Sequence, residues 1–167
     1  MSVLQFGGDD LTALVDQYGL AAITVTIPIH ALIAATPLFP SDVLAIAYGG
    51  VFGYATAVLL AWIGWWLGAI LEFYLVRSAH ALATARAKDD ELQAERRRAP
   101  AWLRRIPVAH PLFLILGRQV PWGGAHIVII PAAIGGVTWR RFLWCSAISI
   151  VPGALLLPAI GAKLWGT

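Results

Sequence analysis

Four ionisable side chains interrupt otherwise apolar segments of the chain, namely His30, Asp42, Arg118 and His126. Placing such a side chain at the centre of a bilayer costs on the order of 2.5–3.5 kcal/mol, so each should face a cavity or a partner. An arginine stays charged and needs an anion or free carbonyl groups beside it, whereas a histidine changes charge near neutral pH. If the segments that carry them meet, the four side chains form one polar site suited to binding an anion and moving protons.

These residues also have structural interpretations. Asp42 follows a Phe-Pro-Ser sequence and is equally suited to cap the helix that begins there. His30 is equally suited to be a neutral buried histidine, bonded to a carbonyl group that a nearby proline leaves free. Glu72 is the one charged residue in a long apolar run, and we expect it to form an ion pair with Arg77 near the end of that run.

Signals for an enzyme or a metal site are weak. The four histidines of the chain are scattered, without the spacing of ligand motifs such as HExxH, and no Ser/His/Asp order is persuasive. Cys145 is the single cysteine, so an internal disulfide is excluded. We expect a protein that is not an enzyme and that holds no metal and no cofactor.

The composition indicates an integral membrane protein. The 167 residues are 59% hydrophobic and only 13% charged, about half the charged share of a soluble domain. Of the 12 lysines and arginines, eight lie between Arg77 and Arg105, and Arg140 and Arg141 form a second cluster. Basic residues in short loops between apolar segments report membrane orientation, so both clusters should face the cytoplasm, and a nucleic-acid partner is not expected.

The elements that position His30 and Asp42 are short. Residues 18–53 are apolar but are interrupted by prolines between 37 and 40. The piece from Val43 to Gly53 rises about 16 Å as a helix, about half of a hydrocarbon core. This predicts a re-entrant hairpin whose break is covered by protein or by a water-filled cavity. Residues 54–77 then form a full transmembrane helix.

The second part of the chain repeats this order. Residues 78–107 are hydrophilic and are expected to form a cytoplasmic linker helix, residues 108–136 a second re-entrant hairpin, and residues 139–165 a second transmembrane helix. Two such halves separated by an odd number of crossings have inverted topology. We therefore predict an all-α integral membrane protein, a single domain over residues 1–167, built from two inverted repeats that each contain a re-entrant hairpin and a transmembrane helix.

The order and spacing of several short motifs resemble the DedA family, also described as SNARE-associated or VTT-domain membrane proteins. The motifs are Phe39-Pro40-Ser41-Asp42 and Gly49-Gly50, then Gly68, Phe73 and Arg77, then Gly117-Arg118-Gln119-Val120-Pro121, Ile130-Pro131-Ala132, Gly135, Phe142 and Pro152. The resemblance implies two opposed re-entrant hairpins and the movement of lipids between leaflets, including undecaprenyl phosphate and phospholipids. It also implies a bacterial inner (cytoplasmic) membrane location, and it places Asp42 on a functional acid and Arg118 on a functional arginine.

The chain departs from that pattern at two positions. His30 stands where members with a proton-linked role carry a carboxylate, and Gly124 stands where they carry a second arginine. His126 is the nearest basic residue to the second of these positions. Two titratable histidines in place of an acid and an arginine leave the substrate and the proton coupling open.

We therefore predict a flippase- or scramblase-type transporter of a phosphate-bearing lipid, with anionic phosphate headgroups as its partners. Arg118 and His126 would bind the substrate, and Asp42 and His30 would carry or gate protons. A proton- or ion-coupled transporter of a small soluble anion and a non-transporting membrane scaffold are the alternatives. Gly64 and Gly68 form a small-xxx-small face that suits a homo-oligomer and packing within one chain equally well.

Overall fold

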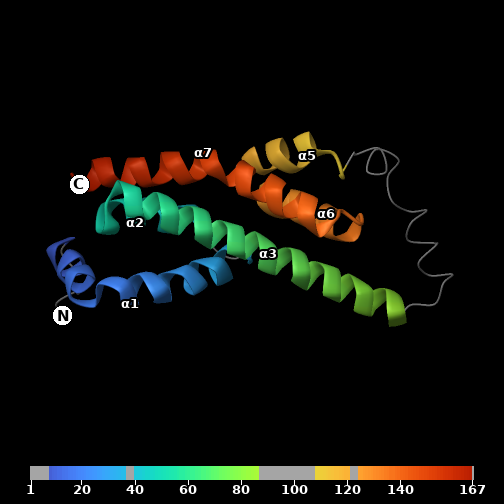
Figure 1. Ribbon diagram of the computed structural model, residues 1–167, viewed down its shortest axis with the longest axis horizontal. Coiled ribbons are helices and arrows are strands. Elements are labelled where there is room, and N and C mark those ends of the chain that lie inside the picture. The colour runs from blue at the N-terminus through green and yellow to red at the C-terminus, as the bar shows by residue number, and fades with distance from the viewer. Residues whose placement is uncertain (1–7, 37–39, 87–107, 121–123, 167) are drawn as a thin grey trace, which may run out of the picture. The chain divides into compact units, whose positions relative to one another are not determined.

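The computed structural model describes residues 8–36, 40–86, 108–120 and 124–166, and the regular elements within these ranges are all helical. The predicted all-α class is therefore confirmed. In chain order the helices are α1 (Gly8–Ala34), α2 (Asp42–Phe52), α3 (Tyr54–Arg86), α5 (Pro111–Leu116), the 3-10 helix η2 (Gly117–Gln119), α6 (Gly124–Ile134) and α7 (Trp139–Trp165) (Figure 1).

The length of the apolar stretch separates these helices into two kinds. Among the described residues, α3 and α7 are the helices long and apolar enough to cross a membrane, with 33 and 27 residues. α1 also has 27 residues, but its apolar part is only Ala21–Ala34. The 11 residues of α2 or of α6 rise about 16 Å, which is too little to cross alone. Shorter apolar helices precede a long one in both parts of the described chain. The re-entrant and inverted arrangement itself stays a prediction.

The ends of two helices differ from the ranges that the sequence suggests. α3 continues without a break to Arg86, so the first residues assigned to the hydrophilic linker belong to the same helix as the span. The rest of that linker, residues 87–107, lies outside the described residues. α1 begins at Gly8 and is kinked at Gly19, whose backbone φ of 32° and ψ of −105° are not helical. Glycine lacks a Cβ and adopts this conformation at little cost.

The chain divides into two compact units, and the two long helices contribute to both. Unit 1 contains residues Met1–Ala69 and Ile150–Thr167, and unit 2 contains residues Ile70–Ser149. Unit 1 thus holds α1, α2, the first part of α3 and the last part of α7. Unit 2 holds α5, η2, α6 and the remaining parts of α3 and α7.

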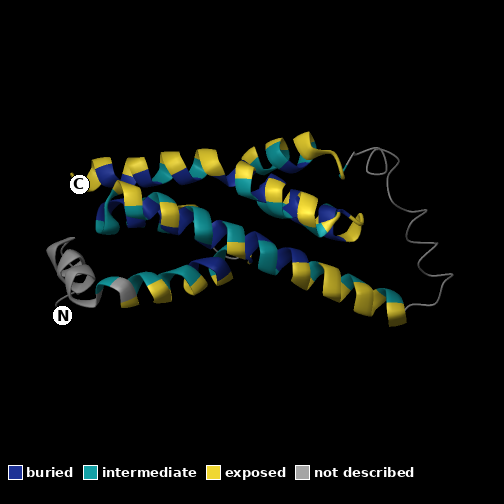
Figure 2. Ribbon diagram, viewed as in Figure 1, coloured by how far each residue is buried: buried dark blue, intermediate teal, exposed yellow. Residues whose placement is uncertain are grey.

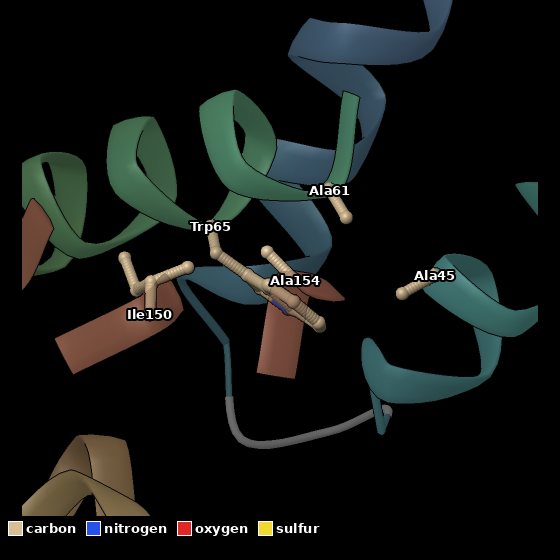
Figure 3. Close-up of a cluster of buried hydrophobic side chains, with 5 residues drawn as sticks. All are labelled: Ala45, Ala61, Trp65, Ile150 and Ala154. Atoms are coloured by element: carbon tan, nitrogen blue, oxygen red, sulfur yellow. The ribbon is translucent and has the colours of Figure 1, made fainter. Parts of the chain in front are cut away.

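The core of unit 1 is built around Trp65, which is 9% exposed. Its indole packs with small side chains of α2, α3 and α7 and with one isoleucine; the members of this cluster are Ala45, Ala61, Trp65, Ile150 and Ala154 (Figure 3). Small residues let helices approach closely, and in lipid such van der Waals packing replaces the hydrophobic effect as the main attraction between helices. A mid-span tryptophan therefore packs against protein, as its position in the sequence indicates.

Glycines set the closest approaches in unit 1. A Cβ at Gly49 or at Gly161 would collide with the backbone carbonyl group of Pro158 or of Ile46, so α2 and α7 touch backbone to backbone. On α3, a Cβ at Gly68 would lie 2.7 Å from the Cβ of Ala34 on α1. The small-xxx-small face of α3 is thus used for packing within the chain.

The core of unit 2 is aromatic. Phe73 is fully buried and stacks on Phe142 with a centroid distance of 4.2 Å. Arg77 lies above the Phe73 ring, with 5.7 Å between Cζ and the centroid, and its Nη1 donates a hydrogen bond of 3.4 Å to the carbonyl oxygen of Val137. Phe73 and Arg77, which carry part of the family resemblance, therefore join α3 to the start of α7.

Many large apolar side chains of the described residues are exposed. Figure 2 marks the exposed positions along α3 and α7 in yellow. On α7 the exposed residues include Trp144 at 73% and Leu156 at 64% of their full surface. Water would disfavour so much exposed apolar area, whereas lipid chains solvate it. This exposed apolar surface is expected for a membrane protein.

The backbone contact at Gly161 predicts the effect of one methyl group. Gly161→Ala should lower the free energy of unfolding by about 1–3 kcal/mol or more, because the Cβ meets backbone that cannot rotate away. Gly153→Ala on the same helix is the control: its Cβ would lie 3.6 Å from the Trp65 ring, an ordinary contact, and alanine favours the helix. Thermal unfolding of both variants in detergent tests this, and equal stability would contradict it.

Candidate functional site

Arg118 lies on a turn that short-range contacts hold in place. His110 caps α5, its Nδ1 accepting a hydrogen bond of 3.2 Å from the backbone N–H of Leu112. The helix then tightens into η2, where the N–H of Val120 bonds to the carbonyl oxygen of Gly117. The chain reaches α6 through a further bond of 3.2 Å from the N–H of Gly124 to the carbonyl oxygen of Val120.

Two glycines let this turn lie directly on α6. A Cβ at Gly117 would approach the Val128 side chain to 2.6 Å, and a Cβ at Gly124 would approach the carbonyl oxygen of Gly117 to 2.8 Å. Neither position has room for a side chain without a shift of its neighbours. Gly124, where the family resemblance implies an arginine, therefore has a packing role in this chain.

The polar side chains of η2 contact α7. The Nη1 of Arg118 lies 3.5 Å from the hydroxyl oxygen of Ser146, a long hydrogen bond, and the Nε2 of Gln119 donates one of 2.6 Å to the carbonyl oxygen of Ser149. The hydroxyl group of Ser149 donates in turn to the carbonyl oxygen of Ser146. Both serines are buried, so these contacts form a polar patch inside an apolar unit.

A buried acid completes this patch. The Oε1 of Glu72 on α3 lies 2.7 Å from the Nδ1 of His126 on α6, a hydrogen bond that the histidine donates when Glu72 is a carboxylate. The expected pairing of Glu72 with Arg77 is wrong, because five residues along a helix place two side chains about 140° apart around its axis. We call Glu72, Arg118, Gln119, His126, Ser146 and Ser149 the Glu72 cluster.

The electrostatics of the cluster are centred on Glu72. Its carboxylate is attracted by His126 through their hydrogen bond and by the guanidinium of Arg118 at longer range. The side chains of Glu72 and His126 are 7% and 21% exposed. Among the described residues, Arg118 makes the single long hydrogen bond to Ser146, and the Nε2 of His126 has no partner. The guanidinium of Arg118 thus keeps donors that a bound anion can use, whereas a neutral His126 ring that donates from Nδ1 has an accepting Nε2.

His30 lies in unit 1 and is completely buried. Its ring makes edge contacts with Tyr48 and Trp65, at centroid distances of 5.3 and 5.5 Å, and packs against Gly64. Neither ring nitrogen has a hydrogen-bond partner among the described residues, so the expected bond to a backbone carbonyl group is not formed there. A proton can reach this ring only if the surrounding helices move apart.

Asp42, also in unit 1, is exposed and is the first residue of α2. The cap position before it is held by Ser41, which makes no side-chain capping bond. The hydroxyl oxygen of Ser41 instead accepts a hydrogen bond of 2.9 Å from the Nε1 of Trp65. Asp42 is therefore not the cap, although a carboxylate in the first turn is favourable at the positive end of the helix dipole.

The structure thus brings Arg118 and His126 to one acid within unit 2, and it places His30 and Asp42 in unit 1. Of the residues that carry the family resemblance, Phe39 and Pro121 lie outside the described residues. The carbonyl oxygen of Pro40 accepts a bond from the N–H of Val43, and the N–H of Gly135 bonds to Pro131, so these two positions form turns at helix ends.

Glu72 is the functional candidate that the sequence did not suggest. The sequence feature that could have identified it is its position as the one charged residue in the apolar run from Tyr54 to Val76. Such a residue usually faces a partner inside the protein. Within the described part of the chain, no group of three His, Cys, Asp or Glu side chains is placed to hold a metal ion.

A family model for the VTT domain matches residues 39–163, which is most of the chain and includes both long helices. This family is membrane-associated and transporter-like. No curated protein and no solved structure matches the chain.

The bond between Ser41 and Trp65 fixes the start of α2 next to Asp42, and a double-mutant cycle measures it. Ser41→Ala and Trp65→Phe should each lower the free energy of unfolding by about 0.5–1.5 kcal/mol through loss of the hydrogen bond, with a further loss of packing at Trp65. The double variant should lose less than the sum of the two. Denaturant unfolding in detergent gives the four values, and strictly additive losses would show that the bond contributes nothing.

Proposed function

Because the chain belongs to the VTT-domain family, we propose that it moves a phosphate-bearing lipid between the leaflets of a membrane, with Arg118 as the residue that binds the phosphate. The lipid is a polyprenyl phosphate such as undecaprenyl phosphate, or a phospholipid. The observation that carries the proposal is the placement of Arg118 on a turn inside an apolar unit, with donors that have no partner among the described residues and with a buried acid near it.

The chemistry of Arg118 supports a phosphate ligand. A guanidinium presents five N–H donors in a planar fork that matches phosphate oxygens in pairs, and it stays charged in an apolar environment. In this chain it makes one long hydrogen bond to another described residue, so most of its donors are available. His126 can add a further donor through Nε2, which has no partner among the described residues, when that nitrogen carries a proton.

The surroundings of Arg118 support a lipid over a soluble anion. Large apolar side chains are exposed on α5, just after η2 and along α6, which are the segments before and after this turn; they are Leu112, Leu116, Val120, Ile127, Ile130 and Ile134. A molecule with a charged head and long apolar chains can place the head at Arg118 and leave its chains on this surface. A small hydrated anion gains nothing from such a surface.

Proton coupling through Asp42 and His30 stays a prediction, as does the location in a bacterial inner membrane. The exposed Asp42 is accessible to protons, whereas the buried His30 requires movement of unit 1. Coupled transport and passive scrambling both remain consistent with the proposed phosphate site.

Lipid exchange in proteoliposomes tests the proposal. Arg118→Gln should slow leaflet exchange of a fluorescent phosphatidylglycerol and of a polyprenyl phosphate analogue by about tenfold or more, because a charge-assisted hydrogen bond contributes on the order of 1.5–3 kcal/mol. Arg140→Gln is the matched control, since it removes an exposed arginine of the same unit and should leave exchange unchanged.

Three outcomes separate the alternatives. Exchange that persists in Arg118→Gln would contradict the phosphate site. Uptake of inorganic phosphate into the same vesicles, with no exchange of lipid, would favour a transporter of a small soluble anion. If neither lipid nor phosphate moves under an imposed pH gradient, the scaffold interpretation gains and the transport proposal fails.

A further inference from the structure

One oxygen of the buried Glu72 carboxylate is left without a partner. Oε1 bonds to His126, but Oε2 is buried and has no hydrogen-bond partner among the described residues. Nearly all buried polar atoms in proteins are paired, and a charged oxygen without a donor is costly. Packing alone gives no reason to keep such an atom. A proton on the carboxyl group would remove the charge and with it most of this cost.

The charges that act on Glu72 are those of His126 on α6 and Arg118 on η2. Two other arginines of the unit have backbone partners elsewhere: Arg77 donates to Val137, and Arg141 donates to the carbonyl oxygen of Ala109. The remaining titratable or charged side chains on the described elements of this unit are Tyr74, His80 and Arg86 on α3, His110 before α5, and Arg140 and Cys145 on α7.

We propose that Glu72 and His126 form a proton-binding pair linked to Arg118, so that a phosphate group binds at Arg118 together with the uptake of one proton by the pair. This inference rests on the proposed function, because it takes a lipid phosphate as the anion. It assigns the proton to a site in unit 2, beside the phosphate, and not to Asp42 or His30.

Electrostatics gives the sign of the linkage. When the pair has lost its proton it carries one negative charge, which attracts Arg118 and repels an incoming phosphate. When the pair holds a proton it is neutral, and the charge of Arg118 is available to the anion. In a buried site these effects are strong because the dielectric constant is low. Since binding linkage is reciprocal, phosphate at Arg118 must also strengthen proton binding by the pair.

The proton balance is simple. The proton enters from solution when phosphate binds, resides on the carboxyl group of Glu72 beside His126, and returns to solution when phosphate leaves. A cycle of lipid binding on one side and release on the other would therefore carry a proton along with the lipid. No oxidant, metal or covalent step is involved.

Calorimetry measures the proton uptake directly. Purified protein in detergent is titrated with a short-chain phosphatidylglycerol near neutral pH, in two buffers that differ in ionisation enthalpy. The difference between the measured heats gives the number of protons taken up per lipid bound. The phosphodiester group of this lipid does not titrate near neutral pH, so any proton belongs to the protein. We expect the wild type to take up a fraction of a proton that approaches one.

Glu72→Gln is the matched variant, because glutamine can still accept the hydrogen bond from His126 but cannot bind the proton. It should bind the lipid with an uptake near zero. Its affinity should change by less than about twofold from about pH 6 to about pH 8, where the wild type should weaken by up to about tenfold per pH unit. Arg140→Gln should behave as the wild type does.

Each possible result supports or overturns the proton linkage, the proposed function or both. Lipid binding by the wild type without proton uptake would overturn this inference and leave the proposed function standing. Undiminished uptake in Glu72→Gln would also overturn it, by placing the proton on another group such as Asp42. Failure of the wild type to bind either phosphatidylglycerol or a polyprenyl phosphate would overturn the proposed function and this inference together. The wild-type measurement keeps the test decisive if the variant does not fold.

Discussion

The hydrogen bond between Glu72 and His126 is the interaction on which unit 2 depends. A carboxylate on an apolar helix must meet a donor inside the protein, and at 2.7 Å His126 supplies one from α6. The longer-range attraction to Arg118 then ties the η2 turn to the same acid. α3 is thereby connected at one buried charge to η2 and α6, which lie far from it in the sequence. Among the described residues, one carboxylate oxygen of Glu72 has no partner and the guanidinium of Arg118 makes one long hydrogen bond.

Unit 1 is stabilised in a different way, by close packing of its helices and by local pairing of its polar atoms. Its helices touch through glycine and alanine, with backbone contacts at Gly49 and Gly161 that admit no side chain. The polar atoms near the start of α2 are paired locally, since Ser41 accepts the indole N–H of Trp65. His30 is the exception, because its ring is enclosed by aromatic neighbours and its nitrogens have no partner among the described residues. Unit 1 is thus closely packed around one polar side chain, whereas unit 2 contains a polar cluster.

The sequence predicted the long helices well because their signal is local. Apolar runs of sufficient length identify α3 and α7, and the prolines and glycines identify the breaks between the short helices. Arg118 was predicted as a site residue because an arginine in an apolar segment needs a partner. The contact between Glu72 and His126 was not predictable, since the two residues are 54 positions apart and meet only in the folded chain. We predicted an ion pair of Glu72 with the nearer Arg77, but Arg77 instead donates a hydrogen bond to the carbonyl oxygen of Val137.

Photo-crosslinking tests most directly whether a lipid phosphate binds at the Glu72 cluster. The probe is a phospholipid that carries a photoreactive group next to its phosphate, and the labelled residues are located by peptide mapping. The account predicts labelling concentrated on η2 and α6, around Arg118 and His126, and its loss in Arg118→Gln. Labelling spread evenly over the exposed apolar surfaces of α3 and α7, and unchanged in that variant, would contradict it.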